Sequence, residues 1–337
     1  MKKSKLAFLL LASCMMLMYT LWQRPVRGTV ATYTPPPTLT DTCYQQPKKS
    51  LVKSQQIVLV GEKVPLHKAA VRKRLERELS HFLYVPAHAR HIAAQARRYF
   101  RVIDPILKRN GIPRDFRYVV AVESGFEADV VSRRGATGLW QFMPVPARRV
   151  GLKINQEVDE RLHLEKSTEA AARYIKLLKR ETGSWTGALA AYNCGLGRYQ
   201  RASGRAGHGD FYKLHMCRET GRYVFKVMAV KEVIERGQLY GLDVNRRGPG
   251  FPDSRRIRIT EPTTLAALAA RHKTDVGTLR SLNPWLVGSS LSASSEKPYF
   301  VLVAPKRTPA LAQATPVARV ERVQFGADST GMVAQSL

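Results

Sequence analysis

Apolar residues recur at helical spacing through most of the middle of the chain. Three such segments follow one another at residues 87–104, 105–111 and 113–124, and the last has Phe116, Val119, Val120 and Val122 on its apolar side. We expect the first helix to end at Asp104, because aspartate can cap a helix and Pro105 can open the next one. No long alternation of apolar and polar residues occurs in this part of the chain. The pattern therefore predicts an all-α core.

Further helices are predicted after residue 165. Ser167 is a typical helix cap before "TEAAARYIKLLKRE", and Gly183 is a typical helix end. The segment "WTGALAAYN" is short and almost wholly apolar, as expected of a buried helix, and "GRYVFKVMAVKEVIERG" closes the region near Gly241. Residues 124–165 contain no such pattern and are predicted to form a long irregular loop. A loop of that length inside a compact domain is usually functional.

A change of composition beyond residue 241 marks a second, smaller domain. The segments "RIRIT", "TTLAALAARHK", "DVGTLRSLNPWL" and "YFVLVAP" predict a strand, two helices and a strand. The predicted division is 1–22, a signal, lipoprotein or membrane-anchor segment; 23–60, an extended linker; 61–86, a helical extension; 87–241, the helical domain; 242–256, a linker; 257–305, a βααβ module; and 306–337, a disordered tail.

Charge is the most unusual property of the composition. The 337 residues include 55 Lys and Arg against 26 Asp and Glu, a formal net charge of +29. Such a balance favours a polyanionic environment: nucleic acid, anionic lipid or an acidic cell-wall polymer. An Arg-preferring genomic background would produce the same balance, so charge alone identifies no partner.

The amino terminus narrows the choice of partner. "MKKSK" is followed by 17 uncharged, mostly apolar residues, "LAFLLLASCMMLMYTLW", which suit either a signal segment or an uncleaved anchor. Within this run, "LASC" resembles the bacterial lipobox, which makes Cys14 a candidate for lipidation. Both interpretations place the rest of the chain outside the cytoplasm and tether it to a membrane. Nucleic acid is therefore not an expected partner.

Export would place the remaining cysteines in an oxidising compartment. Cys194 and Cys217 form a candidate disulfide, with Cys43 left in the linker, but the sequence does not decide the pairing. There is no CxxC motif, and His88 and His91 have no third ligand near them in the sequence. We therefore expect no metal and no cofactor.

Glu123 is an ionisable residue in an apolar setting. It follows directly on the four apolar residues 119–122, at the end of a predicted helix. A carboxylate there loses hydration, so it must find a partner or raise its pKa towards neutral pH. A raised pKa suits acid–base chemistry. The alternative is an ordinary helix-terminal carboxylate paired with Arg117 or Arg133.

Several motifs resemble those of soluble-type lytic transglycosylases, and two are similar to the membrane-bound lytic murein transglycosylase D branch. In chain order they are "ESGF" at 123–126, "GATGLWQFMP" at 135–144, "DER" at 159–161 with "KST" at 166–168, "AAYNCG" at 190–195, and "ET" at 219–220 with Tyr223, Val224 and Lys226. The resemblance implies a lysozyme-like fold, so the expected fold class is mainly α. It also implies cleavage of the β-1,4 MurNAc–GlcNAc bond of peptidoglycan without water. One residue, Glu123, would act first as acid and then as base, and the product would carry a 1,6-anhydro end.

The same resemblance implies a set of residues around the substrate. The amide of Gln141 suits the N-acetyl group of a sugar, and the hydroxyl of Tyr192 is expected against Glu123. The other residues expected to bind substrate are Ser124, Met143, Asn193 and Tyr223. The commoner Ala-Gly-Glu-Gly after Tyr-Asn is replaced by "CGLG", which removes any role of that glutamate.

The carboxy-terminal module resembles a degenerate lysin motif, a module that binds N-acetylglucosamine polymers. Thr264, Leu265 and "LNP" at 282–284 fit its pattern, but Glu261-Pro262-Thr263 stands where the "GDT" turn is usual. Sugar binding and a packing role therefore both stay open for this module.

Two alternatives to the transglycosylase hypothesis remain at this stage. Glu127 or Asp129 could supply a second carboxylate, which would make the chain a lysozyme-like muramidase. A catalytically idle scaffold that binds the wall is the other alternative. In each case the expected partners are peptidoglycan strands and a membrane, on the periplasmic side of a bacterial envelope. The sequence does not indicate an oligomeric state.

Overall fold

The computed structural model describes residues 50–54, 56–204, 210–244 and 250–305. These ranges belong to one compact unit of the chain. Within them, no helix has both the length and the apolar character needed to cross a bilayer. The predicted signal or anchor segment, Cys14, Cys43 and the predicted tail lie outside the described residues.

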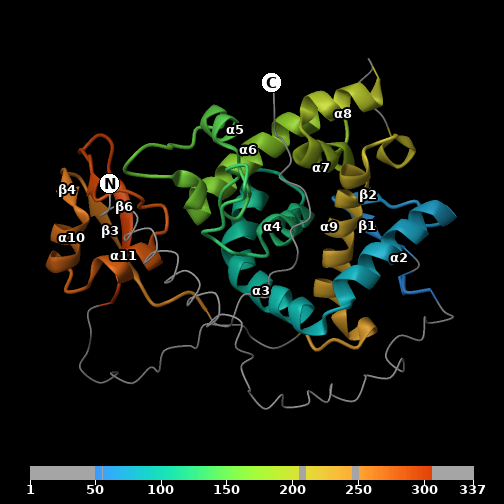
Figure 1. The fold of residues 1–337 in the computed structure, drawn as a ribbon, viewed down its shortest axis with the longest axis horizontal. Coiled ribbons are helices and arrows are strands. Elements are labelled where there is room, and N and C mark those ends of the chain that lie inside the picture. The colour runs from blue at the N-terminus through green and yellow to red at the C-terminus, as the bar shows by residue number, and fades with distance from the viewer. Residues whose placement is uncertain (1–49, 55, 205–209, 245–249, 306–337) are drawn as a thin grey trace, which may run out of the picture. The chain divides into compact units, whose positions relative to one another are not determined.

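The helical domain is preceded by a short hairpin and an additional helix. The bounds in chain order are β1 Val58–Leu59, β2 Glu62–Lys63, α2 Ala69–Leu83, α3 Pro86–Arg109, η2 Arg114–Phe116, α4 Arg117–Ser124, α5 Pro144–Arg149, η3 Glu160–Leu162, α6 Leu164–Thr182, α7 Trp185–Cys194, α8 Leu196–Ser203, η4 Phe211–Lys213, α9 Arg218–Arg236 and η5 Gly237–Tyr240. Helix α9 lies between α2 and α7 and also packs on α4 (Figure 1). Eight of the ten residues of α7 are buried, as its apolar sequence predicts.

Two predicted helix boundaries were wrong. Helix α3 runs through Pro105 without a break. Its neighbours Ile103 and Ile106 are buried, and this tertiary packing outweighs the local cost of proline. Asp104 is not a cap, because its carboxylate pairs with Arg114 and Arg117.

The second boundary concerns Ser167. Helix α6 begins earlier, at Leu164, so Ser167 lies inside its first turn. The Ser167 side chain is fully buried there, and the backbone N–H of Ser167 donates to His163 O at 2.8 Å. The predicted loop at 124–165 is also less irregular than expected, because it contains α5 and η3.

The carboxy-terminal module has the predicted strand–helix–helix–strand order. Strand β3, Arg255–Ile259, pairs antiparallel with β6, Tyr299–Val303, and the helices α10, Leu265–Arg271, and α11, Val276–Leu282, lie between them in sequence. An additional short pair joins β4, Thr263–Thr264, to β5, Ser290–Leu291. The side chains of Thr264 and Asp275 cap the two helices. The prediction of a mainly helical chain with a small βααβ module is confirmed.

Candidate active site

The end of α4 places Glu123 between the helical core and the long loop. Val119 and Val120 are fully buried in the preceding turn. Gly125 then ends the helix at φ 59°, a left-handed conformation that glycine adopts without strain. The carboxyl group therefore lies where an apolar helix meets the segment that the sequence predicts to be functional.

Burial raises the pKa of the Glu123 carboxyl to about 7. The hydrogen bond from Tyr223 and the charge of Lys226 act in the opposite direction, and the charge of Glu219 adds to the rise. A carboxyl group with this pKa both gives up and takes back a proton near neutral pH. The Arg117 alternative does not hold, because that guanidinium pairs with Asp104 and Glu235.

Tyr223, from the first half of α9, is the hydrogen-bond partner of Glu123. Its hydroxyl donates to Glu123 Oε1 at 2.5 Å. Burial raises the pKa of Tyr223 well above its usual value, so its hydroxyl stays protonated and remains a donor. The two residues are 100 positions apart in the sequence. The packing of α9 on α4 brings them together.

Tyr192 lies close to Glu123 but is not bonded to it as the resemblance implies. Its hydroxyl donates instead to the backbone oxygen of Trp140 at 2.8 Å. Burial, followed by the charge of Glu123, raises the pKa of Tyr192 well above its usual value. Tyr192 therefore joins the loop to α7 beside the carboxyl group of Glu123. Tyr223 makes the contact with Glu123 that the resemblance implies for Tyr192.

Gln141 lies in the turn formed by residues 135–142. The backbone of Gln141 has φ 48°, a left-handed conformation that residues other than glycine rarely adopt. Its amide nitrogen donates to Gly138 O at 2.8 Å and more weakly to Val130 O at 3.3 Å. A strained residue fixed by its neighbours is typical of a functional site.

Arg161 holds this turn in place. Its Nη1 donates to Gly135 O at 2.8 Å and to Phe142 O at 3.1 Å, and its Nη2 pairs with Asp159 at 2.7 Å. A Cβ on Gly138 would lie 2.3 Å from Arg161 O. The resemblance identifies residues 159–161 as a motif but assigns them no role. Their role as a brace is visible only in the structure.

The remaining expected substrate residues have local partners. Ser124 Oγ donates to Val120 O in its own helix, and Asn193 Oδ1 accepts from Thr220 Oγ1 at 3.0 Å. Met143 is half-buried at the start of α5. Trp140 is fully buried and its indole donates to Thr168 Oγ1, so it packs the core.

The two candidate second carboxylates are both exposed. Glu127 and Asp129 lie on the loop that follows α4. The carboxylate whose charge acts on Glu123 is Glu219, at the start of α9. Glu127 and Asp129 are therefore close to Glu123 in the sequence but not to its carboxyl group in the structure.

Cys194 and Cys217 are free thiols in the structure. Cys194 is buried and its Sγ contacts Gly195 O, whereas Cys217 is exposed and contacts Thr220 Oγ1. The candidate disulfide is not formed in this structure. Within the described ranges, no group of three or more His, Cys, Asp or Glu side chains is arranged to hold a metal ion.

Two parts of the chain match models of known domain families. Residues 102–215 match the model of the transglycosylase SLT domain, and residues 255–307 match that of the soluble lytic transglycosylase C-terminal LysM-like domain. The chain contains a transglycosylase SLT domain. Glu123, Gln141 and Tyr192 lie within its matched range, and Tyr223 lies beyond its end.

Relatives of this chain include proteins named as transglycosylases of murein or peptidoglycan. Membrane-bound lytic murein transglycosylase D of Escherichia coli K12 is 29% identical over 259 residues, which is 74% of this chain and 56% of that protein. The chain thus spans little more than half the length of that relative. Peptidoglycan transglycosylase gp16 of Escherichia phage T7 is 32% identical over 149 residues, 42% of this chain and 11% of its own.

Solved structures of soluble lytic transglycosylases were also found. Slt70 from Escherichia coli is 24% identical over 40% of this chain and 24% of its own, with a TM-score of 0.33. Slt from Pseudomonas aeruginosa is 21% identical over 45% of this chain and 26% of its own, with a TM-score of 0.34.

Proposed function

We propose that this chain is a lytic transglycosylase that cleaves the β-1,4 bond between MurNAc and GlcNAc in peptidoglycan and leaves 1,6-anhydromuramyl ends. The observation that carries the proposal is the environment of Glu123. Within an SLT domain, one half-buried carboxyl group has a pKa of about 7 and a tyrosine hydroxyl bonded to it at 2.5 Å. Such a group suits both halves of a reaction that needs first an acid and then a base.

The proposed reaction balances with a single carboxyl group. Protonated Glu123 gives its proton to the glycosidic oxygen as the bond from this oxygen to muramyl C1 breaks. The acetamido group of the sugar assists at C1. The Glu123 carboxylate then takes the proton of the muramyl 6-hydroxyl, and O6 bonds to C1. The carboxyl group is restored and no water is consumed.

The exposure of Glu127 and Asp129 favours this reaction over that of a muramidase. A hydrolase that retains or inverts configuration usually needs a second carboxylate facing the same bond. The raised pKa of Glu123 argues against an idle scaffold, because a merely structural carboxyl group gains nothing from a pKa near neutrality.

We also propose that the chain acts in the bacterial cell envelope, on the periplasmic side. The first 22 residues would export and tether it, either as an uncleaved anchor or through lipidation of Cys14. The membrane-bound relative supports this location. Peptidoglycan and a membrane are then the proposed partners, and the positive charge would favour both.

Mass spectrometry of digested peptidoglycan tests the proposed function. Wild-type chain is expected to release fragments whose muramyl ends are lighter by one water than reducing ends. Reducing ends would instead make the chain a hydrolase. If the chain binds the wall but releases no fragments, the scaffold alternative is correct.

Tyr223→Phe is expected to lower kcat/KM about tenfold, the order of one hydrogen bond to a charged group. Because the bond from Tyr223 lowers the pKa of Glu123, its loss raises that pKa. The decline of kcat/KM above pH 7 should therefore move to higher pH in the variant. A pH profile of glycan cleavage measures both effects.

The matched control is Tyr192→Phe. It removes a hydroxyl that donates to Trp140 O rather than to Glu123, so the position of the alkaline decline should stay unchanged. An equal shift in both variants would contradict the role assigned to Tyr223.

A further inference from the structure

One residue of the SLT domain is part of the hydrophobic core of the carboxy-terminal module. Val158, on the long loop before α6, is fully buried among module residues that include Leu286 and Trp285. The backbone of Val158 also forms an antiparallel bridge with Leu286. A core residue supplied by the neighbouring domain indicates a fixed interface rather than a flexible tether.

Hydrogen bonds fix the register of this interface. Asp159 N donates to Trp285 O at 2.9 Å, and the N–H groups of Val287 and Gly288 donate to Glu157 O at 3.1 and 3.0 Å. The Glu157 carboxylate accepts from Ser292 N at 3.1 Å and from Ser292 Oγ at 2.6 Å. We call residues 156–159 the docking segment. Because most of these bonds use backbone atoms, the docking segment has one alignment against the module.

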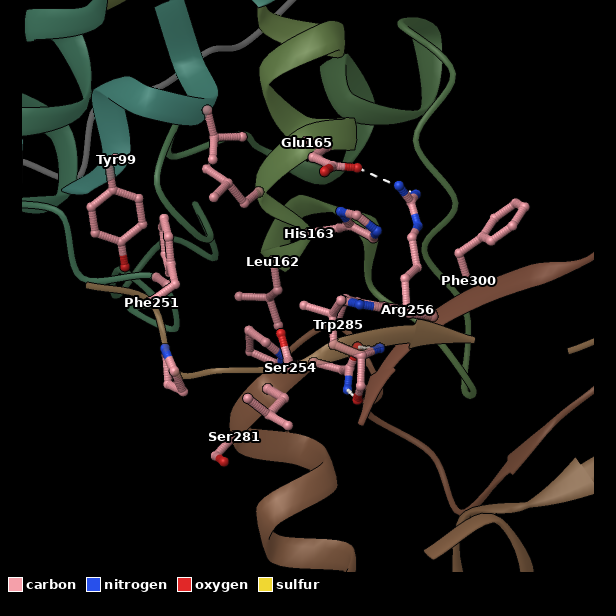
Figure 2. A pocket seen from close by; sticks show the side chains of 18 of the residues that line it. Tyr99, Leu162, His163, Glu165, Phe251, Ser254, Arg256, Ser281, Trp285 and Phe300 are labelled. Atoms are coloured by element: carbon pink, nitrogen blue, oxygen red, sulfur yellow. Dashed lines mark hydrogen bonds and ion pairs between the residues drawn. The ribbon is translucent and has the colours of Figure 1, made fainter. Parts of the chain in front are cut away.

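The start of α6 extends the same interface. Figure 2 shows Arg256 of the module reaching Glu165, an ion pair of 3.4 Å. The ring of His163 lies 5.2 Å from that of Trp285. Burial lowers the pKa of His163 to about 3, so its imidazole is neutral between the two domains. A cavity of about 310 Å³ lies between the two domains beside these residues. None of the residues described above for the candidate active site lines it.

The docking segment continues directly into the brace of the active-site turn. Asp159 bonds to the module through its backbone and to Arg161 through its carboxylate. Arg161 in turn donates to Gly135 O and Phe142 O at the two ends of the 135–142 turn. An unbroken series of contacts thus runs from Trp285 in the module to the turn that carries Gln141.

We propose that the carboxy-terminal module positions the 135–142 turn of the active site by clamping the docking segment, with Val158 and Asp159 as the positioning residues. The module then acts on the reaction from outside the substrate site. The catalytic part of this inference rests on the proposed function. The structural part does not, because it concerns the order of the turn in the full chain.

Gly288→Val tests the proposal at the interface itself. A Cβ at Gly288 would lie 2.6 Å from Gln156 O and 2.8 Å from Glu157 Cα, both backbone atoms of the docking segment. Gly288 does not have a positive φ, so the substitution does not strain the module's own backbone. Gly250→Val is the control, because a Cβ there meets nothing within 4 Å.

Hydrogen–deuterium exchange of the full chain is the first measurement. In the turn, the N–H groups of Thr137, Gly138 and Gln141 are bonded to Phe142 O, Val130 O and Gly138 O. Gly288→Val is expected to speed exchange of these amides at least about tenfold, as local opening becomes easier. Unchanged exchange in the turn, with faster exchange in the docking segment, would overturn the proposal.

Steady-state cleavage of glycan fragments is the second measurement. The variant is expected to lose about tenfold in kcat with little change in KM, because a misplaced group slows the chemical step. A loss confined to KM would mean that the module only binds the wall, and this would also overturn the proposal. If wild-type chain cleaves nothing, the proposed function fails and exchange alone decides the inference.

A second variant covers the case in which Gly288→Val does not fold. Glu157→Ala removes both bonds to Ser292 from a half-exposed position. It should speed exchange of the turn in the same direction by a smaller factor. A folded Glu157→Ala chain in which exchange of the docking segment rises and exchange of the turn does not would refute the coupling.

Discussion

Glu123→Gln is expected to lower glycan cleavage by about three orders of magnitude, the middle of the range for loss of a general acid and base. The amide keeps the shape of the side chain and can still contact Tyr223, but it has no proton to give to the glycosidic oxygen. The measurement is the rate of release of anhydro-ended fragments at pH 6, where the wild-type carboxyl group is mostly protonated. Exposed Glu127→Gln is the control, and we expect it to retain wild-type activity.

The same substitution should stabilise the fold at alkaline pH. In the folded chain the pKa of Glu123 is raised from 4.5 to about 7. The folded state therefore binds more protons than the unfolded state between these values, and stability falls as pH rises through that window. Glutamine removes this cost, which is up to about 3 kcal/mol above pH 7, since one pKa unit is worth about 1.4 kcal/mol.

Thermal unfolding at pH 4 and pH 8 separates the two effects. Wild type and Glu123→Gln should differ little at pH 4, and the variant should be the more stable at pH 8. A variant that loses activity and stability together at pH 8 would indicate that Glu123 is a structural carboxylate, contrary to the proposed role.

The sequence alone predicts the features that depend on neighbouring residues. The apolar run before Glu123 predicts that its carboxyl group loses hydration and has a raised pKa, and the composition of "WTGALAAYN" predicts a buried helix. Both are local patterns. Pro105 shows the limit of such patterns, because the packing of Ile103 and Ile106 on the core decides that α3 continues.

Contacts between distant residues could not be predicted in this way. Whether Tyr192 or Tyr223 bonds to Glu123 depends on how α9 packs on α4 and on α7. Val158 is similar, because one valine in a long loop carries no signal that it completes the core of a module more than 100 residues later. The resemblance names the motifs in order, but the roles of Asp159 and Arg161 require the fold.

Gly138→Ala is expected to cause the second large loss, because the turn has no room for a side chain at this position. Gly138 has φ 76°, and an added Cβ would lie 2.3 Å from Arg161 O and 3.0 Å from Arg161 C. Arg161 cannot give way easily, because Asp159 and the carbonyls of Gly135 and Phe142 hold it. The strained backbone and the overlap together should lower stability by roughly 2–4 kcal/mol.

Activity should fall further than stability explains. Moving the turn displaces Gln141, which the resemblance implies binds the substrate, and a shift of about 1 Å in a positioning group costs on the order of 10²-fold in rate. Gly135→Ala is the matched control: its φ is 82°, equally left-handed, but a Cβ there meets nothing within 4 Å. It should lose only about 1 kcal/mol of stability and keep most activity. We would measure urea unfolding and kcat/KM on both variants, because the comparison distinguishes backbone strain from contact with Arg161. Equal losses in Gly138→Ala and Gly135→Ala would show that Arg161 does not brace the turn.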